Sequence, residues 1–151
     1  MVQKDEVTAE QNVFDLSIFD TKTKANEGFE VEIVDAFGEP TGLFITILGA
    51  DSTTFERATE RWQREQLKIG QQRGRNNPSA TSELMSKARE HDLQTIADCT
   101  VDWRHTTATM PFKASDKSKL MDFYARSKTV YDQVFAALAD RRNFTKASPK
   151  I

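Results

Sequence analysis

The chain has 151 residues, of which 38% are hydrophobic and 29% charged, and its net charge is -2. A chain of this length buries about two-thirds of the surface exposed by its unfolded form, so it can fold around one core. This composition excludes a wholly disordered protein, and the small net charge gives no general attraction to nucleic acid or anionic membranes. The single cysteine, Cys99, cannot form an internal disulfide, which excludes a cross-linked secreted scaffold.

The beginning of the chain predicts a loose segment followed by a short strand. Residues 1–12 are polar and mixed in charge, so we expect a flexible N-terminal arm. No apolar stretch has the length that export or membrane insertion requires, which predicts a cytoplasmic location. Alternating apolar residues predict a strand over Phe14–Phe19, and Lys22 to Gly28 is expected to be a polar connection.

The clearest local pattern is a β-hairpin. Apolar and acidic residues alternate over Phe29–Ile33, and a β-branched and aromatic run follows over Leu43–Leu48. The glycines and the proline between the two runs supply a turn. Phe37 lies on this turn, where it either contacts a partner or folds back onto its own strands.

Helical periodicity follows the hairpin. We expect a helix to about residue 69 with Asp51 or Ser52 as its N-cap, a mobile linker near 70–79, and a second helix to Asp98. Residues 100–113 are expected to form an irregular connection anchored by Trp103. Two more helices are predicted, one capped by Ser115 and ending near Ser127, the other from about Thr129 to Arg142, before a polar tail over 145–151.

These patterns predict a fold of the α+β class. We expect an N-terminal β-hairpin or small antiparallel sheet, which Phe14–Phe19 could extend to three strands, followed by about four helices. A single domain over residues 13–144 accounts for all of these elements.

The sequence offers little that could support catalysis. A nucleophile needs a base within reach, and the histidines are His91 and His105. Cys99 lies between them in sequence, but on a helix it is about two turns from His91 and beyond direct contact. A buried core thiol is the simpler interpretation of Cys99. We therefore expect a protein that is not an enzyme.

Metal and phosphate motifs are also missing. There is no CxxC pair, no HExxH sequence and no acidic loop with the spacing of a calcium site. The glycines from Gly38 to Gly42 lie inside the hairpin and lack the Lys-Ser/Thr ending of a phosphate-binding loop. No cofactor and no metal are expected.

A basic stripe on the first long helix is the main indication of a nucleic-acid partner. Arg57, Arg61, Arg64 and Lys68 lie on one side of the helical wheel. Glutamates interleave with these cations, and pairs such as Glu60 with Arg64 are typical of a solvated helix face. We therefore favour protein binding, for which hairpin edges and amphipathic helices are the usual surfaces.

Several blocks of sequence resemble the phage tail assembly chaperones, which are encoded in the tail-gene region of siphophages and prophages. The first block is GFEVEIVDAFGEPTGLFITILGADSTTF, from Gly28 to Phe55. The others are Trp103, Pro111-Phe112 with Ser115, Phe123-Tyr124, and the ending from Ala139 to Phe144, so that the resemblance spans most of 28–144. One departure is Lys128, which stands where the family has a proline and leaves the break between the last two helices open.

The resemblance implies a non-enzymatic protein of the host cytoplasm. It would coat the tape measure protein, keep the long apolar helix of that protein soluble, and recruit tail tube subunits; self-association is compatible with this role. The residues expected to face a partner are Phe37, Arg57, Arg61, Arg64 and Phe144. The alternatives are a structural tail component retained in the virion and a nucleic-acid-binding regulator. A ribosomal frameshift near the C-terminus that yields a longer product would also fit the resemblance.

Overall fold

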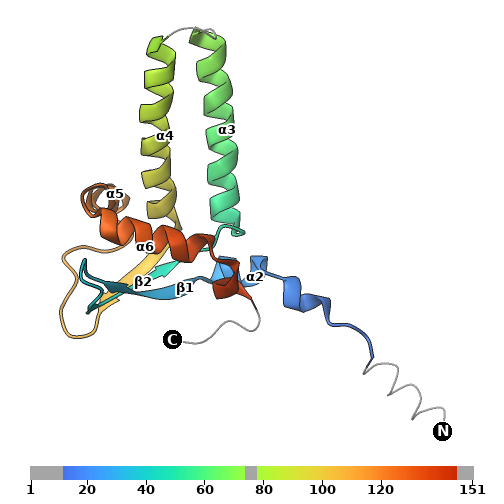
Figure 1. Cartoon of the computed structure of the whole chain (residues 1–151), viewed down its shortest axis with the longest axis vertical. Helices are drawn as coiled ribbons and strands as arrows, with labels where there is room; N and C mark the ends of the chain where they lie inside the picture. Colours follow the sequence, from blue (N-terminus) through green and yellow to red (C-terminus); the bar gives the residue numbers. More distant parts are fainter. Residues whose placement is uncertain (1–11, 74–77, 146–151) are drawn as a thin grey trace.

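The computed structural model describes residues 12–73 and 78–145. A small antiparallel sheet forms the base of the molecule, and a long helical hairpin projects from it (Figure 1). Four α-helices follow the β-hairpin within these residues, so the predicted α+β class is confirmed. The predicted arm over 1–12 falls outside the described residues except for Asn12, and the predicted tail over 145–151 falls outside them except for Thr145.

The sheet has three antiparallel strands in the order β1 (Phe29–Val34), β2 (Pro40–Ile47) and β3 (Thr100–His105). The register pairs Val31 with Ile45 and Ile45 with Trp103. Ile33, Ile45 and Ile47 are buried on the face that carries the core. The predicted β-hairpin is therefore confirmed, and its alternating pattern marks the buried face.

The third strand differs from the one expected. Phe14–Phe19 is not a strand: it ends in the 3₁₀ helix η1 (Leu16–Phe19). The third strand instead comes from the stretch expected to be irregular, where β3 pairs with β2. The anchor expected there is confirmed, because Trp103 is buried and its Nε1 donates a hydrogen bond to the Phe112 carbonyl at 2.9 Å. The prediction of a polar connection from Lys22 to Gly28 is also wrong, because these residues form the short helix α2 (Lys22–Glu27).

The helical hairpin consists of α3 (Thr53–Arg73) and α4 (Pro78–Cys99). The Ser52 hydroxyl accepts a hydrogen bond from the Phe55 amide at 3.2 Å, which makes Ser52 the cap of α3. The predicted linker over 70–79 is too long, since α3 continues through Gly70 to Arg73 and α4 begins at Pro78. A proline in the first turn of α4 costs no hydrogen bond.

Two helices, α5 (Lys117–Arg126) and α6 (Lys128–Ala139), complete the core. The break between them is at Ser127, and the cap of α5 is Asp116 rather than Ser115, since its carboxylate accepts from the Lys119 amide. The last helix is shorter than predicted, because Asp140 is extended and residues Arg141–Phe144 form the 3₁₀ helix η2. The α6 helix lies against the sheet (Figure 1), where Val134 and Leu138 are buried.

Candidate protein-binding surface

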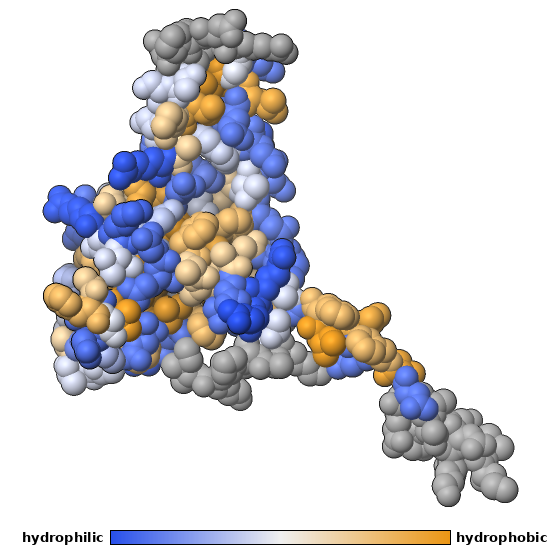
Figure 2. All heavy atoms as spheres, viewed as in Figure 1, coloured by the Kyte–Doolittle hydropathy of each residue, from blue (hydrophilic) through white to orange (hydrophobic). Residues whose placement is uncertain are grey.

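A short segment before α2 exposes its apolar side chains to solvent. We call Val13–Phe19 the apolar arm segment; its large apolar side chains are between 46% and 73% exposed. The Phe14 and Phe19 rings stack with their centroids 6.2 Å apart. Figure 2 shows the segment as an apolar projection from the body of the molecule. Apolar side chains gathered in one exposed place are typical of a surface that another molecule covers.

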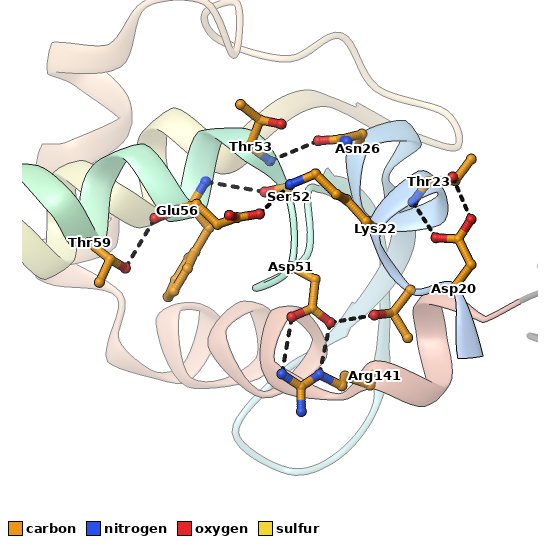
Figure 3. A network of polar contacts seen from close by, with 12 residues as sticks. Asp20, Lys22, Thr23, Asn26, Asp51, Ser52, Thr53, Glu56, Thr59 and Arg141 are labelled. Atoms are coloured by element: carbon orange, nitrogen blue, oxygen red, sulfur yellow. Dashed lines mark hydrogen bonds and ion pairs between the residues drawn. The ribbon is translucent and has the colours of Figure 1, made fainter.

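The segment is carried by a helix that is fixed to the body (Figure 3). Three side-chain contacts join α2 and the residue before it to the start of α3, namely Thr21 with Asp51, Lys22 with Glu56 and Asn26 with Thr53. Ala25 of α2 is fully buried, and its carbonyl accepts a hydrogen bond from the Gly49 amide at 3.1 Å. The apolar arm segment therefore extends from a rigid attachment.

Two aspartates accept local hydrogen bonds here, Asp15 within the segment and Asp20 directly after it. Asp15 accepts from the Ser17 amide at 3.0 Å, and Asp20 accepts from the Thr23 amide at 3.1 Å. The hydrogen bonds from the Thr23 amide and hydroxyl lower the pKa of Asp20. One acidic group therefore lies among the exposed apolar side chains of the segment, and a second lies at its end.

The tip of the β-hairpin exposes a second large apolar side chain. Phe37 is 90% exposed, so it does not fold back onto its own strands. Asp35 holds the turn, since its Oδ1 accepts from the amides of Phe37 and Glu39 at 2.9 and 3.0 Å. Gly38 has a φ of +81°, a conformation that a residue with a Cβ rarely adopts. Partner contact by Phe37 stays a prediction, but the side chain is accessible for it.

The projecting helical hairpin exposes apolar groups as well. Leu67 on α3 is 66% exposed and Met85 on α4 is 70% exposed. Leu67 lines a shallow depression on α3 together with Gln63, Gln66, Gly70 and Gln71. Leu67 lies in the second half of α3 and Met85 in the first half of α4, so both belong to the half of the hairpin nearer the turn between the two helices. The core does not cover Leu67 or Met85, so both side chains are accessible to a partner.

The expected basic residues of α3 are exposed, but two of them have acidic partners. Arg61 pairs with Asp98 of α4 at 3.3 Å, and Arg64 pairs with Glu60 at 3.7 Å. Arg57 is exposed and forms no ion pair within the residues described. The stripe is thus partly neutralised, as expected for a solvated helix face.

Phe144 does not face a partner. It is 2% exposed, and its ring packs edge-on against Phe29 with their centroids 6.1 Å apart. A Cβ added at Gly49 would lie 2.9 Å from the Phe144 ring, which shows how closely the ring covers this glycine. The prediction is wrong because η2 turns the chain back onto the core after α6. Phe144 is a core residue.

The titratable groups named from the sequence are separate in space. His91 stacks on Trp62 with ring centroids 5.1 Å apart, and burial lowers the pKa of His91. Cys99 lies two helical turns further along α4, about 12 Å away. Cys99 is buried, which raises the pKa of its thiol to about 12. His105 lies at the end of β3, where its Nδ1 accepts from the Ala108 amide at 2.9 Å. These groups do not form a nucleophile with an adjacent base.

Residues 12–73 and 78–145 contain neither a metal site nor a membrane span. No three His, Cys, Asp or Glu side chains lie close enough to hold a metal ion. None of the helices in these ranges combines the length and the apolar character needed to cross a bilayer.

Comparison with known proteins finds no matching family model, no similar curated protein and no similar solved structure.

The sequence did not indicate the apolar arm segment as an exposed surface. Its alternating apolar residues predict a strand, and five of the seven residues from Val13 to Phe19 are apolar. Asp15 and Asp20 indicate turns better than the apolar pattern indicates a strand. An aspartate two or three residues before a serine or threonine is typical of a turn capped by a side chain.

Proposed function

We propose that this chain is a non-enzymatic assembly chaperone of a phage tail. It would act in the host cytoplasm, bind the tape measure protein, and help to recruit tail tube subunits. The observation that carries the proposal is the exposure of large apolar side chains on parts that project from the core, namely Phe37 on the β-hairpin and Leu67 and Met85 on the helical hairpin. The resemblance of residues 28–144 to tail assembly chaperones supplies the identity of the partner.

The helical hairpin suits a partner that is itself a long helix. An amphipathic helix is bound through apolar anchors on its partner, with charged groups around them. Leu67 and Met85 supply such anchors, and Arg57, Arg61 and Arg64 place cations on the same helix, α3. A long apolar helix that bound these side chains would expose less of its apolar surface to water. It would therefore be less able to aggregate.

Co-purification of the tape measure protein with the tagged chain tests the proposal. Changing Leu67→Glu together with Met85→Glu puts charges at both anchors, and we expect affinity to fall by about a hundredfold, or tenfold for each large apolar group lost. The matched control is Thr59→Glu, which adds a charge to an exposed position of α3 and leaves both anchors intact. If the double variant retains as much tape measure protein as the control, the helical hairpin is not the binding surface.

Two measurements separate this proposal from its alternatives. An assembly chaperone is absent from purified particles, whereas a structural tail component remains in them in stoichiometric amounts. A nucleic-acid-binding regulator would bind with an affinity that falls steeply with salt concentration. Because Arg61 and Arg64 have acidic partners, we expect no such binding. A reading frame for a long helical protein directly downstream of the gene would be further support.

A further inference from the structure

His105, the last residue of β3, joins two segments of the chain through both nitrogens of its ring. Its Nε2 donates a hydrogen bond to the Thr41 carbonyl near the start of β2, at 2.9 Å. Its Nδ1 accepts hydrogen bonds from the amides of Thr107 and Ala108, at 3.1 and 2.9 Å. The ring therefore ties β2 to the segment that leaves β3. We call these three hydrogen bonds the His105 latch.

The latch requires one protonation state of the ring. A ring nitrogen accepts a hydrogen bond through its lone pair, so Nδ1 carries no proton. The Thr41 carbonyl oxygen is an acceptor, so Nε2 carries the proton that it donates. The latched ring is therefore neutral.

A glycine beside the ring allows the latch to close. A Cβ added at Gly42 would lie 2.9 Å from His105 Nε2 and 2.8 Å from Thr106 Oγ1. Gly42 also has a φ of +79°, a conformation that favours glycine. Its carbonyl accepts a hydrogen bond from the Thr106 amide at 3.1 Å. The segment after β3 can therefore approach β2 closely at this point.

The latch holds one end of an irregular segment. Residues 106–110 form neither helix nor strand, and 106–109 are exposed. Trp103 holds the chain beyond them, because its Nε1 donates to the Phe112 carbonyl and its ring lies 4.7 Å from the Phe112 ring. Thr109, Met110 and Phe112 line one pocket with Trp103, of about 560 Å³. Movement of the segment would therefore change a wall of this pocket.

The contacts to Nδ1 come from uncharged groups. Neither β2 nor residues 106–109 contain a titratable side chain. On β3, Arg104 is bound by Glu30, and Asp102 accepts from the Trp103 amide. The charged side chains of the adjoining segments are Asp35 and Glu39 in the hairpin turn, Asp102 and Arg104 on β3, and Lys113 further along the loop.

We propose that His105 is a proton-sensitive latch, which holds residues 106–110 against β2 when its ring is neutral and releases them when Nδ1 takes up a proton. A protonated Nδ1 is a donor that faces two amide donors, so both of its hydrogen bonds are lost. The bond to Thr41 remains, because Nε2 donates in both states. Histidine changes its charge between about pH 8 and 5. This inference does not depend on the proposed function.

Three variants isolate the latch. His105→Asn places a carbonyl oxygen as many bonds from Cα as Nδ1, so it keeps an acceptor for the two amides without a titratable ring. His105→Ala removes the acceptor. His91→Gln is the matched control, because it removes the other histidine of the chain.

NMR relaxation of the Thr107 and Ala108 amides measures the release. The measurements are made at about pH 8 and about pH 5, because most carboxylates stay charged over this range. In the wild-type chain and in His91→Gln we expect order parameters of about 0.85 at the higher pH and below about 0.6 at the lower one. His105→Asn should stay ordered at both values, and His105→Ala should be mobile at both.

Three results would overturn the proposal. The first is a wild-type chain whose Thr107 and Ala108 amides have the same order at both pH values. The second is a loss of order at the lower pH that persists in His105→Asn, because another group would then control the segment. The third is His105→Ala with ordered amides at the higher pH, which would show that the ring does not hold the segment.

Discussion

Arg141 binds Asp51 through two hydrogen bonds, with Nε donating to Oδ2 at 2.8 Å and Nη2 donating to Oδ1 at 3.1 Å. The same carboxylate accepts a hydrogen bond from the Thr21 hydroxyl at 2.6 Å. Three distant parts of the chain therefore meet at Asp51, namely the residue before α2, the junction between β2 and α3, and η2 (Figure 3). The attachment of the apolar arm segment depends on this junction.

The first prediction concerns the stability of this junction at low pH. The hydrogen bonds from Arg141 and Thr21 lower the pKa of Asp51 from its ordinary value of 3.8. A carboxyl group with a lower pKa in the folded chain stabilises the fold above its unfolded pKa, and this stabilisation is lost as the pH falls through the folded value. We expect Asp51→Asn to cost about 1 kcal/mol at pH 7 and progressively less as the pH falls below the ordinary value of 3.8.

Urea denaturation at a series of pH values measures this difference. The control is Asp132→Asn, which removes a carboxylate from an exposed pair with Lys128 on α6. Exposed helix pairs contribute about 0.3 to 0.5 kcal/mol, so its effect should be smaller. A loss for Asp51→Asn that is the same at every pH would show that the ionised carboxylate is not what stabilises the junction.

The second prediction compares two phenylalanines that the sequence did not distinguish. Phe144→Ala opens a cavity beside Gly49 and Phe29, and we expect it to lower the free energy of unfolding by about 3 to 5 kcal/mol. Phe37→Ala removes an exposed ring, and its effect on stability should stay within about 0.5 kcal/mol. Thermal or chemical unfolding of both variants measures the contrast. Equal losses would contradict the placement of the two rings.

The third prediction concerns the reactivity of Cys99. Burial raises the pKa of its thiol to about 12, and only the thiolate reacts with thiol reagents. At pH 8 we expect labelling of the folded chain to be at least about a thousandfold slower than labelling of the chain unfolded in urea. A disulfide exchange reagent followed by absorbance measures both rates. Rapid labelling of the folded chain would show that Cys99 is an accessible thiol.

The parts of the fold predicted from the sequence have regular periodicity. The β-hairpin alternates over Phe29–Ile33, and Val134 and Leu138 lie four residues apart on the buried side of α6. The β3 strand has no such pattern, because a shift in register between Thr46 and Ile47 leaves Thr100 and Trp103 buried three residues apart. An irregularity in pairing depends on the neighbouring strand, so the periodicity of β3 alone does not reveal it.

The candidate surface was only partly predictable. Phe37 and the arginines of α3 could be named because turn chemistry and helical periodicity place them at the surface. Phe144 could not be assigned correctly, since its burial depends on how η2 folds back toward Gly49. A groove between α4, α5 and α6 also brings together residues distant in sequence, such as Leu93 and Tyr131. Only tertiary contacts determine such sites.

The most direct test of the proposed function is the soluble fraction of the tape measure protein when it is expressed with and without this chain. An assembly chaperone should move most of the tape measure protein from the pellet to the supernatant. Leu67→Glu with Met85→Glu should abolish this effect, whereas Thr59→Glu should preserve it. A tape measure protein whose solubility is the same with and without the chain would contradict the proposed function.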